Sequence, residues 1–101
     1  MSGMRPNIYA PQIDQSRKVI DGYHSDRARV GTQAGAERLG ISVWELDAGQ
    51  AAYPYHFHLT EEEALVVLEG RPTLRTTDGM SQLERGDVVA FPRGEEGAHQ
   101  L

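Results

Sequence analysis

The chain has 101 residues and no cysteine, which limits it to one domain and excludes disulfides, thiolate metal sites and cysteine nucleophiles. Its 10 basic and 15 acidic side chains give a formal charge of −5, which argues against binding to nucleic acid or to an anionic membrane. The longest apolar run, Ala64 to Leu68, is far shorter than the ~20 residues of a membrane span, and Met1 to Pro11 lacks the apolar core of a secretory signal. These features predict a cytoplasmic protein.

The first part of the chain, residues 1–37, is expected to form an N-terminal arm. Over residues 1–27 the composition is polar, the apolar side chains are scattered, and Pro6 and Pro11 prevent a continuous helix. Two alternatives remain open for this arm. It is either loosely attached to its own domain, as chain termini commonly are, or it crosses to a partner subunit.

Residues 38–101 have the pattern of a domain built from short strands. The segment 41–46 alternates in polarity and ends at a turn signal, Asp47-Ala48-Gly49. Further extended segments are expected at 51–58, 62–68, 73–77, 80–83 and 87–91. Between two of them, Asp78-Gly79 predicts a hairpin with a type I′ turn, which needs positive φ at both central residues. Strands spaced by roughly ten residues, with glycine or proline at the turns, predict an all-β sandwich or barrel.

Three of the four histidines, His56, His58 and His99, lie in this β region. On a strand, residues i and i+2 point to the same face, so His56 and His58 would stand side by side. Two imidazoles fill an apolar core poorly, because each has two polar nitrogens, but together they can bind a metal. An acidic run, residues 61–63, leads directly into an apolar strand. It is either a solvated turn or, at Glu63, a further metal ligand.

The spacing of these residues extends into two ordered motifs, Gly49-x6-His56-x-His58-x4-Glu63-x6-Gly70 and Gly86-x5-Pro92-x-Gly94-x4-His99. They resemble the two motifs of the cupin superfamily, G-x5-H-x-H-x(3,4)-E-x6-G and G-x5-P-x-G-x2-H-x3-N. The resemblance covers residues 49–99 and is strongest to small single-domain bacterial cupins, often described as mannose-6-phosphate isomerase-like. It implies a double-stranded β-helix, a jelly-roll barrel, over residues 38–101.

The resemblance also implies one divalent transition metal inside the barrel, held by His56, His58, Glu63 and His99. Three neutral imidazoles and one carboxylate suit Fe, Mn, Ni, Cu or Zn without choosing among them. A divalent ion beside one carboxylate leaves a net charge of about +1, which attracts an anionic oxygen ligand. Four protein ligands on an octahedral ion would leave two positions for substrate or water.

The sequence departs from the motifs at three places. The first motif has one extra residue after Gly49, and the second has Glu95-Glu96-Gly97-Ala98 where two residues are usual. The asparagine of the second motif and the final strands of the barrel would lie beyond Leu101. The barrel is therefore expected to be incomplete at its C-terminus, the natural chain to continue, and His99 to be the most weakly held ligand.

The resemblance favours a small metalloenzyme, an isomerase, dioxygenase, decarboxylase or lyase, that acts on a small polar or anionic metabolite. The alternative is a non-catalytic module that binds a sugar or an organic acid, because one fold serves both uses. A homodimer is also expected. Ala64, Val66 and Leu68 form an apolar face opposite Glu63, so this strand should be covered on both sides. Tyr53, Tyr55 and Phe57 are interpreted as core residues, with a subunit interface as the alternative.

Overall fold

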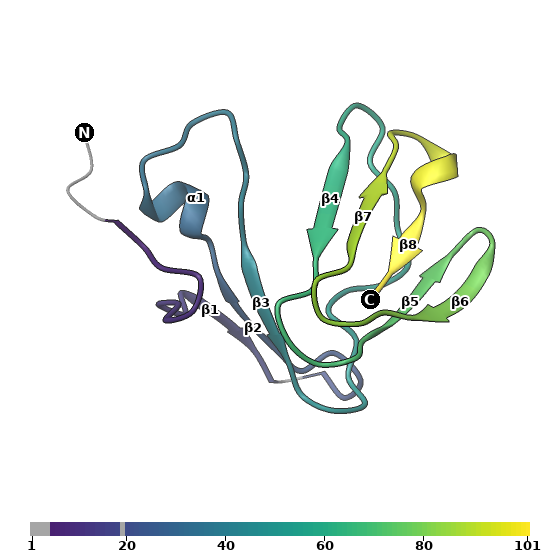
Figure 1. The fold of residues 1–101 in the computed structure, drawn as a ribbon, viewed down its shortest axis with the longest axis horizontal. Coiled ribbons are helices and arrows are strands. Elements are labelled where there is room, and N and C mark those ends of the chain that lie inside the picture. The colour runs from purple at the N-terminus through teal and green to yellow at the C-terminus, as the bar shows by residue number, and fades with distance from the viewer. Residues whose placement is uncertain (1–4, 19) are drawn as a thin grey trace. The chain divides into compact units, whose positions relative to one another are not determined.

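The structure is a computed structural model that describes residues 5–18 and 20–101 (Figure 1). The chain divides into two compact units, Met1–Ala52 and Tyr53–Leu101. In the described residues, the regular structure is almost entirely β-strand, as the sequence predicts. None of the helices found there has the length and apolar character that a bilayer crossing requires.

The first unit contains a three-stranded antiparallel sheet of β1 (Gln15–Arg17), β2 (Ser25–Ala28) and β3 (Val43–Leu46), in that order. A single helical turn, α1 (Val30–Gln33), follows β2. Arg27 lies opposite Trp44 in the register, with its guanidinium 5.0 Å from the centre of the indole ring. This cation–π contact adds a side-chain interaction to the backbone pairing of β2 with β3.

The prediction of an irregular arm over residues 1–27 is wrong for β1 and β2. Their polar composition gives no strand signal, because both strands are held by backbone pairing: β1 pairs with β2, and β2 pairs in turn with the distant β3. Ser25 and Ala28 are the buried residues of β2, so the strand shows no two-residue apolar alternation. The boundary after residue 37, between arm and barrel, stays a prediction.

The second unit contains two sheets around one small apolar core. One sheet pairs β4 (Glu63–Val66) with β7 (Val88–Phe91). The other has the order β6-β5-β8 and is formed by β6 (Gly79–Gln82), β5 (Thr73–Thr76) and β8 (His99–Gln100). A 3₁₀ turn, η1 (Glu95–Gly97), precedes β8. Both sheets contribute to the core, whose buried members are Val67, Leu74, Leu83 and Phe91.

The alternation predicted for the strand around Glu63 is confirmed. Glu63 and Leu65 are half-buried and face the core side, whereas Ala64 and Val66 are exposed. Val66 is 52% exposed, and Val88, its partner on β7, is 68% exposed. This apolar face is the one for which the sequence suggests a covering partner, and the homodimer stays a prediction.

The hairpin at Asp78-Gly79 is confirmed, but its turn is displaced by one residue. Thr76 pairs with Gly79, so the connecting residues are Thr77 and Asp78. Gly79 has a φ of +115°, whereas no described non-glycine residue has positive φ, so the predicted type I′ turn is wrong. The Thr76 hydroxyl accepts a hydrogen bond from the backbone N–H of Asp78 (3.2 Å), which supports the observed turn.

Candidate metal centre

All four predicted ligands lie in the second unit, on three segments of the chain. Glu63 begins β4 and His99 begins β8, whereas His58 lies in a loop. The segment 51–58 is not a strand, and its β-pairing is limited to a single bridge between His56 and His99. The bridge has two backbone hydrogen bonds, His56 N–H to His99 O (3.1 Å) and His99 N–H to His56 O (2.9 Å). It joins the first and second sequence motifs directly.

The side chains of His56, His58 and Glu63 form a group that can hold a metal ion. One potential ligand atom from each of these residues lies within 4.8 Å of the other two. His58 Nε2 is 2.9 Å from Glu63 Oε2, and His99 Nε2 is 3.0 Å from Glu63 Oε1. The two oxygens of one carboxylate therefore each face an imidazole nitrogen.

Backbone carbonyls orient two of these imidazoles. Nδ1 of His56 is 2.9 Å from the carbonyl oxygen of Pro54, and Nδ1 of His99 is 2.7 Å from that of Gly97. A carbonyl oxygen only accepts hydrogen bonds, so these contacts assign the Nδ1 nitrogens as donors. In the neutral rings Nε2 then carries a free lone pair. This outer contact is how proteins usually prepare a histidine for metal binding.

The donor atoms fit a cation. The Nε2 lone pair of a neutral His99 would face a carboxylate oxygen of Glu63, and two electron-rich atoms at 3.0 Å require a proton or a cation between them. His58 Nε2 is shielded from solvent and forms no aligned hydrogen bond, although a carboxylate oxygen lies 2.9 Å away. A divalent ion would satisfy both nitrogens and the carboxylate.

His99 is the most firmly enclosed of the four residues, with 0% of its side chain exposed. The Phe91 ring stacks on the imidazole with a centroid distance of 3.6 Å and an interplanar angle of 9°. This enclosure fixes the His99 ring in place, and the expectation that His99 is the most weakly held ligand stays a prediction. The extra residues before it form η1 and bring the Gly97 carbonyl to its ring.

Tyr53, which the sequence predicts to be a core residue, lies next to the candidate metal ligands. Its ring meets the His56 ring edge-on at 4.5 Å and the His99 ring edge-on at 5.7 Å. Burial and, to a lesser degree, the negative charge of Glu63 raise the pKa of Tyr53, so its phenol stays protonated at neutral pH. The sequence feature that could have indicated a place near the site is its position three residues before His56, directly followed by Pro54.

Tyr55 and Phe57 do not fill a core as predicted, because 37% and 40% of these residues are exposed. The Arg75 guanidinium lies 4.4 Å from the centre of the Tyr55 ring. Arg71 pairs with Glu84 at 3.0 Å on the exposed surface.

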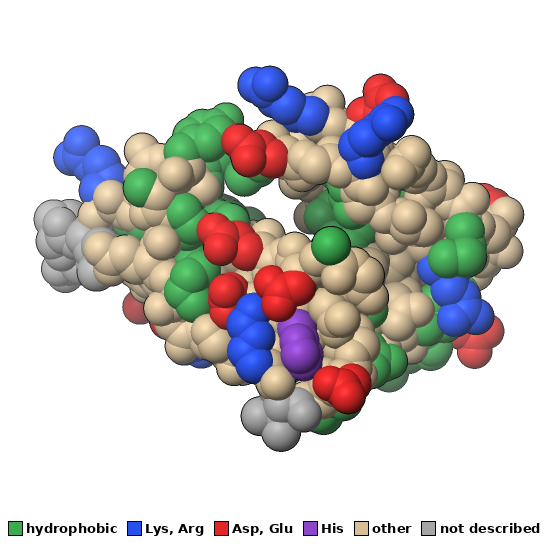
Figure 2. Space-filling view, turned by 90° about the horizontal axis from the view of Figure 1, so that it is seen from below, with side chains coloured by type: hydrophobic (Ala, Val, Ile, Leu, Met, Phe, Trp, Pro, Cys, Tyr) green, Lys and Arg blue, Asp and Glu red, His purple; other side chains and the backbone are tan. Residues whose placement is uncertain are grey.

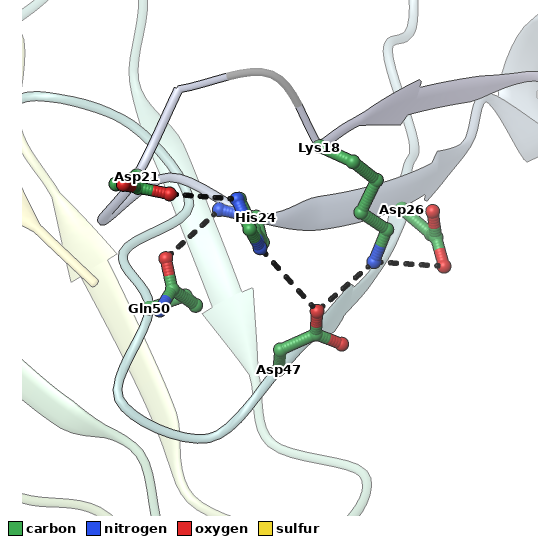
Figure 3. A network of polar contacts seen from close by, with 6 residues as sticks. All are labelled: Lys18, Asp21, His24, Asp26, Asp47 and Gln50. Carbon is green, nitrogen blue, oxygen red and sulfur yellow. Dashed lines mark hydrogen bonds and ion pairs between the residues drawn. The ribbon is translucent and has the colours of Figure 1, made fainter.

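His24 lies in the first unit, in a polar network rather than with the other histidines. Figure 2 shows acidic side chains around one basic side chain and one histidine on the face viewed. In the close-up, His24 lies 3.7 Å from Asp21 and 4.0 Å from Asp47 (Figure 3). Lys18 contacts Asp47 at 3.1 Å and Asp26 at 3.7 Å, and the hydrogen bond to Asp47 raises the pKa of Lys18.

Replacing Gly97 with alanine is expected to destabilise the second unit. A Cβ at this position would overlap the carbonyl oxygen of Pro92, so η1 would have to move away. Overpacking of this kind costs typically ~1–3 kcal/mol, measured as the loss in free energy of unfolding in urea. The matched control is Gly40→Ala, because nothing lies within 4 Å of a Cβ at Gly40. Equal stability of Gly97→Ala and Gly40→Ala would contradict this prediction.

A mostly β unit with a group of two histidines and one glutamate defines a candidate metal-binding β-protein. Residues 42–100 match the cupin domain family, and this is more than half of the chain, which therefore belongs to that family. The match confirms the resemblance seen in the two motifs.

Two relatives extend this result. The auxin-binding protein ABP19b of Prunus persica is 33% identical over 66 residues, which cover 59% of this chain and 32% of that protein. A solved structure, described as a sugar phosphate isomerase from a cupin superfamily of Silicibacter pomeroyi, aligns with a TM-score of 0.79 and 23% identity. That alignment covers 96% of this chain and 65% of the isomerase chain, and it establishes the cupin fold. The chain thus spans about a third of the first relative and under two thirds of the second.

Proposed function

We propose that this cupin domain binds one divalent transition metal through His56, His58, Glu63 and His99. The observation that carries the proposal is the convergence of imidazole Nε2 atoms on the two carboxylate oxygens of Glu63. Hydrogen bonds from Nδ1 to backbone carbonyls leave the Nε2 lone pairs of His56 and His99 available to bind the metal. The mixture of imidazole and carboxylate is suited to Fe, Mn, Ni, Cu or Zn.

We further propose that the domain is a small metalloenzyme acting on a small polar or anionic metabolite. The bound metal would supply Lewis-acid polarisation of a substrate oxygen. Within the chain, Glu63 provides the only carboxylate of the proposed ligand set, so a divalent ion leaves a net positive charge that favours an anionic substrate. The complete burial of His99 excludes water from that side of the centre.

Among isomerase, dioxygenase, decarboxylase and lyase activities, isomerisation is the first to test. The support is the structural likeness to a protein described as a sugar phosphate isomerase, which is an analogy at the level of the fold. The second candidate function is a non-catalytic binding module. It is favoured by the sequence similarity to an auxin-binding protein, whose description names a ligand and no reaction.

Metal binding is expected to raise the melting temperature of the chelator-treated protein. A ligand at 100 times its dissociation constant stabilises the folded state by about 2.7 kcal/mol, and each kcal/mol shifts the melting temperature of a small domain by ~4–8 °C. Titration with Mn²⁺, Fe²⁺, Ni²⁺, Cu²⁺ and Zn²⁺ should therefore give a saturable rise of at least ~10 °C for one ion. Ca²⁺ serves as the control, because it prefers sites made entirely of oxygen. No rise with any transition metal would contradict the proposed centre.

Two assays on the metal-bound protein then distinguish the isomerase from the binding module. Incubation with sugar phosphates, followed by NMR of the products, should show metal-dependent interconversion if the domain is an isomerase. Calorimetric binding of auxin or of a sugar phosphate, with the ligand recovered unchanged, would instead support the binding module.

A further inference from the structure

The Tyr53 ring contacts a proposed metal ligand from each of the two sequence motifs, His56 from the first and His99 from the second. The ring stands at 89° to the His56 ring and at 90° to the His99 ring. The backbone carbonyl of Tyr53 accepts a hydrogen bond from the side chain of Gln100 (3.1 Å), the residue that follows His99. Tyr53 is thus attached by its backbone to β8 and by its ring to both histidines.

Edge-to-face contacts restrict the rotation of the rings that form them. The electron-poor edge of one ring meets the electron-rich face of the other, and such pairs contribute about 0.5–1.5 kcal/mol beyond the burial of area. A rotation of the His56 or His99 ring would give up this contact together with its Nδ1 hydrogen bond to a carbonyl. The Tyr53 ring therefore supports the ring orientation in which the Nε2 atoms of both histidines are available to bind a metal.

We infer that Tyr53 is a positioning residue of the metal centre, whose ring sets the planes of His56 and His99 relative to Glu63. The inference rests on the proposed function, because it describes how the same ligands are held. Tyr53 acts through the ligands and is not one itself. Its neighbour Tyr55 provides a natural comparison, since the Tyr55 ring packs against Arg75 and is 37% exposed.

Binding of Co²⁺ measures this role, because its visible absorption reports coordination geometry and its titration gives affinity. Tyr53→Leu removes the aromatic ring and is expected to weaken Co²⁺ binding about tenfold or more, the range for loss of a partner outside the ligand shell, and to shift the absorption bands. Tyr53→Phe keeps the ring and should keep the parent affinity and spectrum. Tyr55→Leu, the matched control, should also match the parent.

Three results would overturn the inference. They are parent-like affinity and spectrum in Tyr53→Leu, an equal loss in Tyr55→Leu, or a loss in Tyr53→Phe as large as in Tyr53→Leu. If Tyr53→Leu does not fold, Tyr53→Trp replaces it. The wider ring should displace the imidazoles and shift the cobalt bands, and unchanged bands would count against positioning.

A parent protein that binds no Co²⁺ would refute the proposed metal centre. The positioning of the two imidazoles by Tyr53 is tested separately, on the metal-free protein. In ¹⁵N–¹H spectra of the metal-free protein, Tyr53→Leu should shift the ring signals of His56 and His99 and leave those of His24 in place. Unshifted signals of His56 and His99 would overturn the inference even if the parent binds metal.

Discussion

Replacement of His58 with alanine is expected to lower the metal content of the purified protein to background. The variant loses one imidazole and leaves the Oε2 atom of Glu63 without its neighbour at 2.9 Å. Removal of a partner outside the ligand shell already weakens metal binding by about 10–100-fold, so loss of a ligand should exceed that range. Elemental analysis after desalting measures the result as metal per chain.

His24→Ala is the control for this prediction, since it removes an imidazole of the first unit that contacts Asp21 and Asp47. Its metal content should equal that of the parent. A stoichiometric metal content in His58→Ala would show that the ligand assignment is wrong, whatever the control gives.

Truncation of Phe91 is expected to have the largest effect on stability. Phe91 is 4% exposed, belongs to the core of the second unit and stacks on the His99 ring. Phe→Ala substitutions in a core cost about 3–5 kcal/mol, a large part of a typical net stability of ~5–15 kcal/mol. The free energy of unfolding, obtained from urea denaturation, should fall by this amount, and the variant should also retain less metal.

Val88→Ala is a control on the same strand, because Val88 is 68% exposed. Its cost should stay under about 1 kcal/mol. Equal losses in Phe91→Ala and Val88→Ala would mean that the core of the second unit lies elsewhere.

The motif spacing anticipated the grouping of His56, His58 and Glu63, although the secondary structure around them differs from the expected strand. Spacing between ligands reflects what a common ion requires, and different backbone paths can meet that requirement. Alternation likewise predicted which face of β4 is buried, since a two-residue period follows directly from the geometry of a strand.

Features that depend on contacts between distant segments were not predictable in the same way. The strand β2 pairs with β1 on one side and with the distant β3 on the other, and the polar sequence of β2 has no apolar alternation from which it could be predicted. The contacts of Tyr53 with two imidazoles depend on the bridge between His56 and His99, residues that are far apart in sequence. The enclosure of His99 depends on η1, formed by residues that fall outside the usual motif spacing.

X-ray absorption at the edge of the bound metal is the most direct test of the proposed centre. With zinc or a similar ion, we expect nitrogen and oxygen neighbours at about 2.0–2.2 Å, with outer-shell scattering from three imidazoles. His99→Ala should reduce that signal to two imidazoles or abolish metal binding. A spectrum without imidazole scattering, or one that His99→Ala leaves unchanged, would contradict a centre formed by His56, His58, Glu63 and His99.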